Sequence, residues 1–262
     1  MLRFWGIHVL TFIGAAWHGP TAQAVIAGVA VYCLLMFGIT AGYHRYFSHR
    51  SFKTSRAGVA VLAFIAQCSG QQGVLWWGSH HRKHHRYSDQ ERDVHSPVQR
   101  GWLYSHVGWV WNPENQPTDF DGIKDLASFP ELRWLNRYWV LPPVLLATFC
   151  GLTLGWSGLF WSYGLATVAA WHATFCVNSV CHLWGSKPFD TGDDSRNNWF
   201  VALIAFGEGW HNNHHHYQSS ARQGFAWWQL DITYVLLRLL AVVGLVWDVR
   251  EPPAELMGAQ NT

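Results

Sequence analysis

The chain has 262 residues, of which half are hydrophobic and only 13% are charged, about half the charged share of a typical soluble domain. A formal net charge of +2 without a polybasic run argues against a nucleic-acid-binding protein. Eighteen tryptophans, a residue enriched where membranes meet water, favour a membrane protein, and sixteen mostly clustered histidines are a second unusual feature. The five cysteines form no CxxC pair, which favours buried thiols in a reducing compartment.

The first long apolar block follows Arg3 and reaches Arg45 without one Lys, Arg, Asp or Glu. It is long enough for two helices of about 20 residues, the length that crosses the hydrocarbon core. His18-Gly19-Pro20 predicts a turn between them, because glycine and proline interrupt helices. We therefore expect a retained transmembrane hairpin over about residues 4–43, not a cleaved signal peptide.

The second apolar block runs from Tyr138 to Ser186, again without a formal charge. The segment 155–158, Gly-Trp-Ser-Gly, divides it into another hairpin, expected over about residues 138–181. Pro142 and Pro143 near its start suit the first turn of a helix.

The distribution of positive charge predicts the orientation of these hairpins. All but one of the 18 Lys and Arg residues lie in segments 45–137 and 187–262, and such residues favour the cytoplasmic side. The predicted fold is an all-α integral membrane protein, with four transmembrane helices in two hairpins and a cytosolic helical cap. We expect a single domain over 1–262, with both termini cytoplasmic and the cap formed by about residues 44–137 and 182–262. A soluble all-α protein is the alternative, disfavoured by the lengths of the paired apolar blocks.

Two shorter apolar stretches lie at Ala57–Val74 and Ile232–Val249. The first is interrupted by polar residues and the second carries Arg238, and an unpaired intramembrane arginine is costly. We expect helices that lie in the membrane interface or pack on the cap, with a fifth and a sixth span as the alternative.

The first histidine pair, His44 and His49, directly follows an apolar span. Residues five apart do not share one face of a regular α-helix, so the segment is expected to end a helix and turn, with both rings directed into one site.

Two further clusters repeat the spacing HxxHH in distant parts of the chain, and i, i+3, i+4 spacing places three rings on one helical face. The histidines with this spacing are His81, His84 and His85 in the first copy and His211, His214 and His215 in the second. His182 follows Asn178 by four residues at the end of the last span, and adds one further ring and one amide. Taken alone, the cluster at residues 80–85 has a solvated basic helix as its alternative.

These residue types indicate a metal site. Neutral imidazole binds Fe, Zn, Cu and Ni, whereas a structural zinc site needs four ligands and usually includes thiolates. The number of imidazoles exceeds that need and predicts two metals with positions left open. No Glu-x-x-His pair occurs, so the pattern of soluble di-iron bundles is absent from the sequence.

Seven segments match one known family in both residues and intervals. They are 38–45, 49–53, 77–89, 93–96, 105–109, 178–182 and 207–215. Through them the chain resembles the integral-membrane fatty-acid desaturases of the stearoyl-CoA desaturase type, most closely the short bacterial forms, over roughly residues 38–250.

The resemblance implies a histidine-rich site for two iron ions. Its implied ligands are His44, His49, His81, His84, His85, His182, His211, His214 and His215. Asn178 falls where the family meets one metal through water, and Trp77 aligns with a tryptophan that lines the bend of the acyl tunnel. An interfacial anchor is the alternative for Trp77. His80 and His216 adjoin the matched segments without belonging to them.

Acidic residues near the clusters are candidate acceptors for the second N–H of the ligating rings. Asp93 and Glu208 lie inside matched segments and rank first. A solvated surface role is expected for the others, which are Asp89, Glu91, Asp190, Asp193 and Asp194.

The implied reaction uses O₂ and two electrons to introduce a cis double bond, by resemblance at Δ9, into a long acyl chain. A membrane hydroxylase of the same histidine-box superfamily is the runner-up, and a metal transporter or storage protein is third. The acyl group is carried by CoA, acyl-carrier protein or a glycerolipid. No His-Pro-Gly-Gly haem signature occurs, so the expected electron donor is a separate ferredoxin or cytochrome b5, and Arg82, Lys83 and Arg86 are candidates for its docking patch. The expected location is a bacterial inner membrane.

Overall fold

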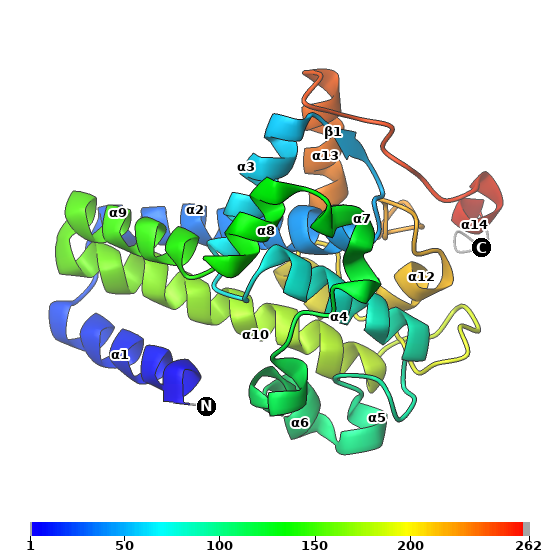
Figure 1. Ribbon diagram of the computed structural model, residues 1–262, viewed down its shortest axis with the longest axis horizontal. Coiled ribbons are helices and arrows are strands. Elements are labelled where there is room, and N and C mark those ends of the chain that lie inside the picture. Colours follow the sequence, from blue (N-terminus) through cyan, green and yellow to red (C-terminus); the bar gives the residue numbers. More distant parts are fainter. Residues whose placement is uncertain (1, 259–262) are drawn as a thin grey trace.

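Helices dominate the computed structural model, which describes residues 2–258 (Figure 1). An elongated helical arm extends to the left in Figure 1, and the remaining elements form a cap to its right. The arm contains α1 (Leu2–His18), α2 (Ala22–Phe37), the π-helix η1 (Gly38–Ser48), α9 (Leu141–Ser157), the π-helix η5 (Gly158–Gly164) and α10 (Leu165–Ser179).

The cap consists mainly of short helices joined by loops. Between the two halves of the arm they are α3 (Arg56–Gln67), α4 (Val74–Tyr87), α5 (Pro97–Arg100), α6 (Trp102–His106), η2 (Gly108–Trp111), η3 (Pro113–Asn115), η4 (Asp121–Ile123), α7 (Lys124–Ala127) and α8 (Pro130–Arg137). After the arm they are η6 (Val180–His182), α11 (Trp199–Ile204), α12 (His211–His216), α13 (Ile232–Val242) and α14 (Ala254–Gly258). Strands β1 (Lys53–Thr54) and β2 (Val246–Trp247) pair antiparallel, a small departure from an all-α fold that joins the C-terminal segment to the segment after His49.

Both turns of the arm lie at its far end, away from the cap (Figure 1). The chain reverses at Gly19 and at Gly155, where φ is 65° and 66°, values that glycine adopts without a steric penalty. Ser157 joins the two turns, because its hydroxyl donates to Gly19 O at 2.9 Å and accepts from Thr21 N at 3.2 Å. The two hairpins are therefore fastened to each other at their tips.

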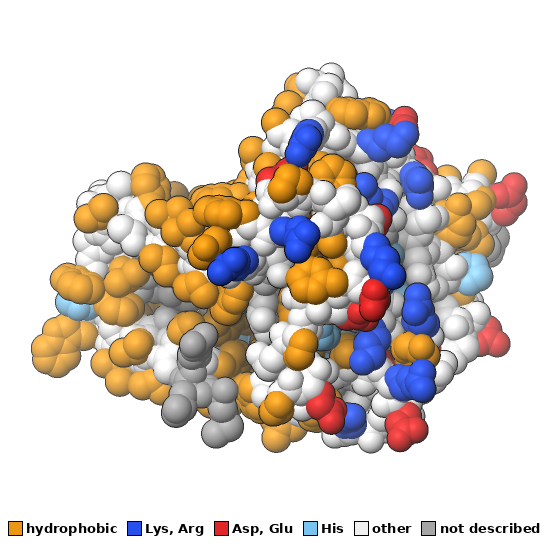
Figure 2. Space-filling model, viewed as in Figure 1, with side chains coloured by type: hydrophobic (Ala, Val, Ile, Leu, Met, Phe, Trp, Pro, Cys, Tyr) orange, Lys and Arg blue, Asp and Glu red, His pale blue; other side chains and the backbone are white. Residues whose placement is uncertain are grey.

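The arm has the surface expected of a membrane segment. Apolar side chains cover it, whereas the charged side chains gather on the cap (Figure 2). Leu10, Ile26 and Leu152 are 66%, 72% and 83% exposed in the isolated chain. Two helical segments are long and apolar enough to cross a membrane, Ala22–Ser48 and Leu141–His182. The described helices thus support two candidate spans, and four transmembrane helices remain a prediction.

The two shorter apolar stretches form α3, with 12 residues, and α13, with 11. Both are shorter than the roughly 20 residues that a span requires. On α13, Arg238 is exposed and pairs with Glu251.

Helix α3 packs tightly on the π-helix η1 through two glycines. A Cβ on Gly38 would lie 2.8 Å from Ile65 O, and one on Gly42 would lie 3.1 Å from Ala66 Cβ. Any larger residue would separate the two helices. This contact fixes the end of η1 that enters the cap.

Candidate metal centre

The π-helix η1 brings the first two histidines together. Residues five apart lie about 140° apart around a regular α-helix, but hydrogen bonds in a π-helix span five residues. Here His49 N donates to His44 O at 3.3 Å, and the two ring centroids lie 4.9 Å apart. The predicted end of a helix and turn is therefore a wider helix that ends at Ser48.

Helix α4 divides its three matched histidines between two groups of rings. His81 and His85, four residues apart, face one group, and His84 faces the other. His80 belongs to neither group, because its Nδ1 bonds to Trp76 O at 2.8 Å and its ring stacks on Trp76.

Helix α12 makes the same division in the opposite sense. His211 and His215 face the group that contains His84, and His214 faces the group that contains His81. The repeated HxxHH spacing thus lets each helix contribute to two neighbouring sites. His216 stacks on Phe189 and lies outside both groups.

Two asparagines hold α12 in place although it has only six residues. Asn212 donates through Nδ2 to Phe189 O at 3.0 Å and to Ser195 O at 3.1 Å. Asn213 donates to Gln223 O at 2.8 Å and accepts from Asn197 Nδ2 at 2.7 Å. These hydrogen bonds explain why both x positions of HxxHH are asparagines here. Their side-chain amides anchor a helix that is too short to be held by many packing contacts.

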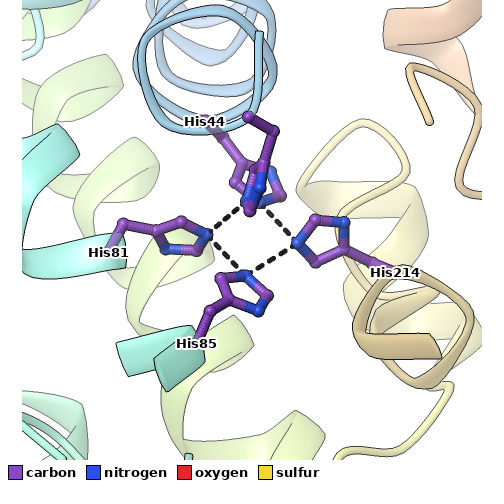
Figure 3. A group of neighbouring side chains, drawn as sticks. His44, His81, His85 and His214 are labelled. Atoms are coloured by element: carbon purple, nitrogen blue, oxygen red, sulfur yellow. Dashed lines mark hydrogen bonds between the residues drawn. The ribbon is translucent and has the colours of Figure 1, made fainter. Parts of the chain in front are cut away.

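The first group contains five histidines with ring nitrogens within 4.8 Å of one another. Its members are His44, His49, His81, His85 and His214. Figure 3 shows four of them, His44, His81, His85 and His214, with their rings directed toward one another. Four Nε2–Nε2 distances are each 2.9 Å: His44 to His214, His214 to His85, His85 to His81, and His81 to His49. The rings come from η1 and the residue after it, α4 and α12.

The second group contains four buried histidines, His84, His182, His211 and His215. His84 Nε2 lies 3.3 Å from His215 Nε2, and His182 Nε2 lies 3.1 Å from His211 Nε2. The rings come from α4, η6 and α12, so both groups are assembled from segments far apart in the chain.

This donor set fits two metal ions. Nitrogens bound at right angles to a metal about 2.1 Å away lie about 3 Å apart, close to the observed spacings. Imidazole nitrogens without thiolates suit iron and other first-row metals. Nine rings exceed what one ion can bind, and they already form two groups.

Carboxylates hold three of the four rings in the second group. His84 Nδ1 donates to Asp93 at 3.0 Å, His182 Nδ1 to Asp89 at 2.8 Å, and His215 Nδ1 to Asp193 at 2.6 Å. Each contact places the N–H on Nδ1 and leaves the lone pair on Nε2, where a metal would bind. Asp89 and Asp193 were expected at the surface, and that expectation was wrong, because loops fold both of them onto the rings. No local spacing in the sequence signals these contacts.

The first group has one such carboxylate. Glu208 is hydrogen-bonded to His44 Nδ1, and Arg45 in turn pairs with Glu208 at 3.1 Å and with Asp231 at 2.9 Å. Arg45 is 1% exposed, so its two carboxylates offset the cost of burying its charge. Nothing in the sequence indicates that Arg45 and Asp231 would pair beside the site. Glu91, Asp190 and Asp194 make none of the described contacts with the nine rings.

The environment keeps most of the cap histidines neutral, as a metal requires. Burial and neighbouring histidines hold the pKa of His81, His85 and His214 well below the usual value. His84 differs: burial opposes protonation, but Asp93 raises its pKa. Although burial opposes ionisation, the bond to His182 lowers the pKa of Asp89 to about 2, so this carboxylate is ionised at neutral pH.

A cavity of about 30 Å³ adjoins both groups. Its lining includes His44 and His81 of the first group, His84 and His211 of the second, and Asn178. The other lining residues are mostly apolar, namely Met36, Ile39, Trp77, Val177 and Ala205, and the polar ones are Thr174 and Glu208. Trp77 stacks on both Tyr43 and His81, with centroids 5.3 and 5.0 Å away. A space of this size admits one or two small molecules beside the rings.

An open cleft of about 590 Å³ lies on the outer side of α4. Arg82, Lys83 and Arg86 line it, together with Arg92 from the following loop and Arg100 at the end of α5. Arg82 also pairs with Asp125 at 2.7 Å. The three residues suggested for partner docking thus lie in one cleft, whose lining also includes the acidic residues Glu91, Asp93, Glu114 and Asp119.

Comparison with known proteins assigns the chain to a family. The sequence model described as "Fatty acid desaturase" matches residues 20–247. An acyl-CoA C20 Δ5-desaturase of Anemone leveillei is 36% identical over 94% of this chain and 80% of its own length. An sn-2 palmitoyl-lipid 9-desaturase of Nostoc is 37% identical over 87% of this chain and 82% of its own length. A hex-5-enoyl-[acyl-carrier protein] acetylenase of Moorena producens is 36% identical over 97% and 86%, respectively.

Proposed function

The chain belongs to the fatty acid desaturase family, and we propose that it introduces a cis double bond at the Δ9 position of a long-chain acyl group. As an acyl desaturase it is an oxidoreductase. Two groups of converging histidines beside one small cavity with apolar residues in its lining are the observation that carries the proposal. The balanced reaction is RCH₂–CH₂R + O₂ + 2e⁻ + 2H⁺ → RCH=CHR + 2H₂O.

The nine histidines would hold two iron ions, one in each group, and Asn178 would meet one of them through water. Bound iron would supply the oxidising power that an unactivated methylene requires, because such a C–H bond has no acidity for a base to exploit. Asp89, Asp93 and Asp193 orient the rings of the second group, and Glu208 orients His44.

Apolar residues would position the acyl chain beside the two groups. Met36, Ile39 and Val177 line the cavity, and each buried methylene contributes about 0.8 kcal/mol of binding. Trp77 stacks between Tyr43 and His81, and its rigid indole would shape the path of the chain.

We place the arm in a membrane as four transmembrane helices, with the cap and both termini on the cytoplasmic side of a bacterial inner membrane. The apolar surface of the arm and the separation of charge onto the cap support this orientation. A single domain over 1–262 would then comprise the hairpins and the cap.

The cleft on the outer side of α4 would serve the electron supply. Lys83 and Arg86 would attract an acidic carrier, such as a ferredoxin or cytochrome b5, to the outer side of the helix that bears His81, His84 and His85. The acyl carrier is CoA, acyl-carrier protein or a glycerolipid, and relatives of similar identity are named for each of these classes.

The test is the fatty-acid profile of host membranes with and without the expressed chain, by gas chromatography–mass spectrometry after derivatisation of double bonds. A new cis-monoene with its bond at carbon 9 is expected. A hydroxy acid in place of the alkene would contradict desaturation and favour the hydroxylase alternative. A monoene with the bond elsewhere would contradict only the Δ9 assignment. The matched control is the variant H84A, which should give the profile of the empty host.

A further inference from the structure

A second row of histidines lies outside the two groups, where α1, α10 and α6 meet. His8 Nε2 is 3.0 Å from His172 Nε2, and His172 Nδ1 is 3.0 Å from His106 Nε2. His106 Nδ1 is 3.0 Å from Ser179 Oγ. Because His172 uses both nitrogens, the row is linear and the nitrogens do not converge on one point, unlike the metal groups.

Both ends of this row meet backbone carbonyls, which only accept hydrogen bonds. His8 Nδ1 donates to Phe4 O at 2.8 Å, and Ser179 Oγ donates to Phe175 O at 2.7 Å. The row therefore contains five hydrogen bonds, whereas three neutral imidazoles and one hydroxyl supply only four protons. One bond lacks a proton when every ring is neutral, and a single added proton completes all five.

The surroundings of the row are aromatic and carry no charge among the described contacts. Phe4, Trp5 and Trp171 lie against His8, and Trp102 stacks on His106 with centroids 4.9 Å apart. Burial lowers the pKa of His106, which favours the neutral form of this ring and the release of a proton that it has taken up. His172 is partly exposed, so this ring is the point at which a proton can enter the row from outside the protein.

The inner end of the row approaches the metal centre. Ser179 adjoins Asn178, which lines the cavity beside His81, His84 and His211. A second cavity of about 20 Å³ is lined by Asn178, His95 and Trp109, and it is large enough for one water. Two buried polar atoms of its lining residues make no hydrogen bond, Trp109 Nε1 and His95 Nδ1, although His95 Nδ1 lies 3.9 Å from Asp93. Such atoms in a small cavity are ordinarily satisfied by water. Because the rings of His95 and His84 lie 4.3 Å apart between centroids, polar groups continue from Asn178, the neighbour of Ser179, toward His84.

We propose that His8, His172, His106 and Ser179 form a proton relay that supplies protons for oxygen reduction at the metal centre. This rests on the proposed function, in which each turnover consumes two protons at rings that are buried from solvent. A proton taken up at His172 completes the five hydrogen bonds, and one released from the inner end leaves the row one proton short again. The tautomers of the three rings then shift, and the cycle repeats for the second proton.

The test compares H172Q and H106Q with the control H18Q in the full chain, purified in lipid nanodiscs with iron and an electron donor. Glutamine keeps a hydrogen bond but cannot carry an extra proton. His18 lies at the other end of α1 and stacks on Trp156, outside the row. We expect a roughly ten- to hundredfold lower kcat for H172Q and H106Q, an unchanged KM for the acyl substrate, a larger solvent isotope effect, and partial rescue by added imidazole. The variant H18Q should match the wild type.

A readout independent of turnover is ¹⁵N spectroscopy of histidine-labelled, metal-free chain. The resonances of His8, His106 and His172 should titrate together with the uptake of one proton, and H172Q should abolish that joint step. Three independent titrations would overturn the relay, as would wild-type kcat and isotope effect in H172Q. Loss of iron in proportion to activity would also overturn it in favour of a structural role. If the wild-type chain forms no alkene, the proposed function fails, and the joint titration still decides whether the row shares a proton.

Discussion

The two histidine groups are built from the same helices but differ in the charge that surrounds them. In the second group, three of the four rings each donate a hydrogen bond to a different carboxylate. The carboxylates are those of Asp93, Asp89 and Asp193. In the first group only His44 has a carboxylate partner, and Arg45 offsets the charge of that glutamate. Equal spacing in the sequence thus produces unequal sites, because the carboxylates come from loops and not from the motif helices.

This difference has a chemical consequence. Hydrogen bonds from Nδ1 to carboxylates make a ring a stronger ligand and fix its orientation. The negative charge near the second group should therefore hold its metal more tightly and favour a higher oxidation state there. The Nδ1 atoms of His85 and His214 in the first group are buried without a protein partner. The first group should exchange its metal more readily.

The largest expected effect follows from removing one ring from either group. Both H84A and H214A should lower activity by more than about 100-fold, because each removes a ligand from a closed set. Metal content should fall while membrane insertion is retained, measured by iron analysis of purified chain and by carbonate extraction of membranes. H216A is the control, with a milder loss. Near-normal turnover in either ligand variant would show that the ligand assignment is wrong.

Breaking the charge network of the first group should reduce stability. Replacement of Arg45 by methionine leaves Glu208 and Asp231 buried without their cation, a loss of about 3–5 kcal/mol. The measurement is thermal unfolding in detergent. R238M removes an exposed arginine paired with Glu251 and should cost at most about 1 kcal/mol. Equal losses in the two variants would contradict the assignment of a buried network.

The unequal carboxylates predict unequal metal affinities. D93N and D89N should weaken binding at the second group by about 10- to 100-fold, leaving close to one iron per chain at limiting metal. E208Q should affect the first group less, because Arg45 already offsets Glu208. Titration with a competing chelator measures both. A larger loss for E208Q than for D93N would reverse the comparison.

Acidification should destabilise the metal-free chain. The pKa of His81, His85 and His214 is lowered in the fold, so these rings bind protons more readily when unfolded. Stability is then lost as pH falls below about 6.5, the unperturbed histidine value. His84, whose pKa Asp93 raises, partly offsets this loss. The unfolding temperature should fall between about pH 7.5 and 5.5, and more steeply in D93N. A flat profile would contradict neutral, buried rings.

The smallest effect is expected for acids that are close in sequence but not in contact. D190N and E91Q should retain metal content and activity within about twofold, because neither residue makes a described contact with the nine rings. Assays of D193N and D89N alongside these two variants show whether an acid must contact a ring to matter or need only be near one in the sequence. A tenfold loss in either would show a role that these contacts do not reveal.

Most of the histidine ligands could be predicted, because the spacing within each motif determines which rings lie close together on a helix. The HxxHH repeat places its rings through helical periodicity, and α4 and α12 are both helices. The convergence of His44 and His49 was expected, but its cause was not, since the backbone of η1 departs from α-helical spacing. Asp89 and Asp193 were misassigned because their contacts depend on loop paths that bring distant residues together.

The membrane hairpins were predictable because the composition of the apolar blocks determines them. Features that depend on contacts between distant segments were not predictable. The uncharged blocks with glycine at their centres indicated the hairpins, and the chain does reverse at Gly19 and Gly155. The row formed by His8, His172 and His106 joins three separate elements, so no spacing between residues in the sequence predicts it. Arg45 lies inside the matched segment 38–45, but its role could not be read from the sequence, because its two partners lie more than 160 residues away.

The most direct test of two unequal metal sites is Mössbauer spectroscopy of the purified chain loaded with ⁵⁷Fe. We predict two iron ions per chain and two quadrupole doublets of equal area, with different parameters because three carboxylates bond to the rings of one site and only one to those of the other. D93N should shift one doublet and leave the other unchanged. A single doublet, or one iron per chain at saturation, would contradict the account.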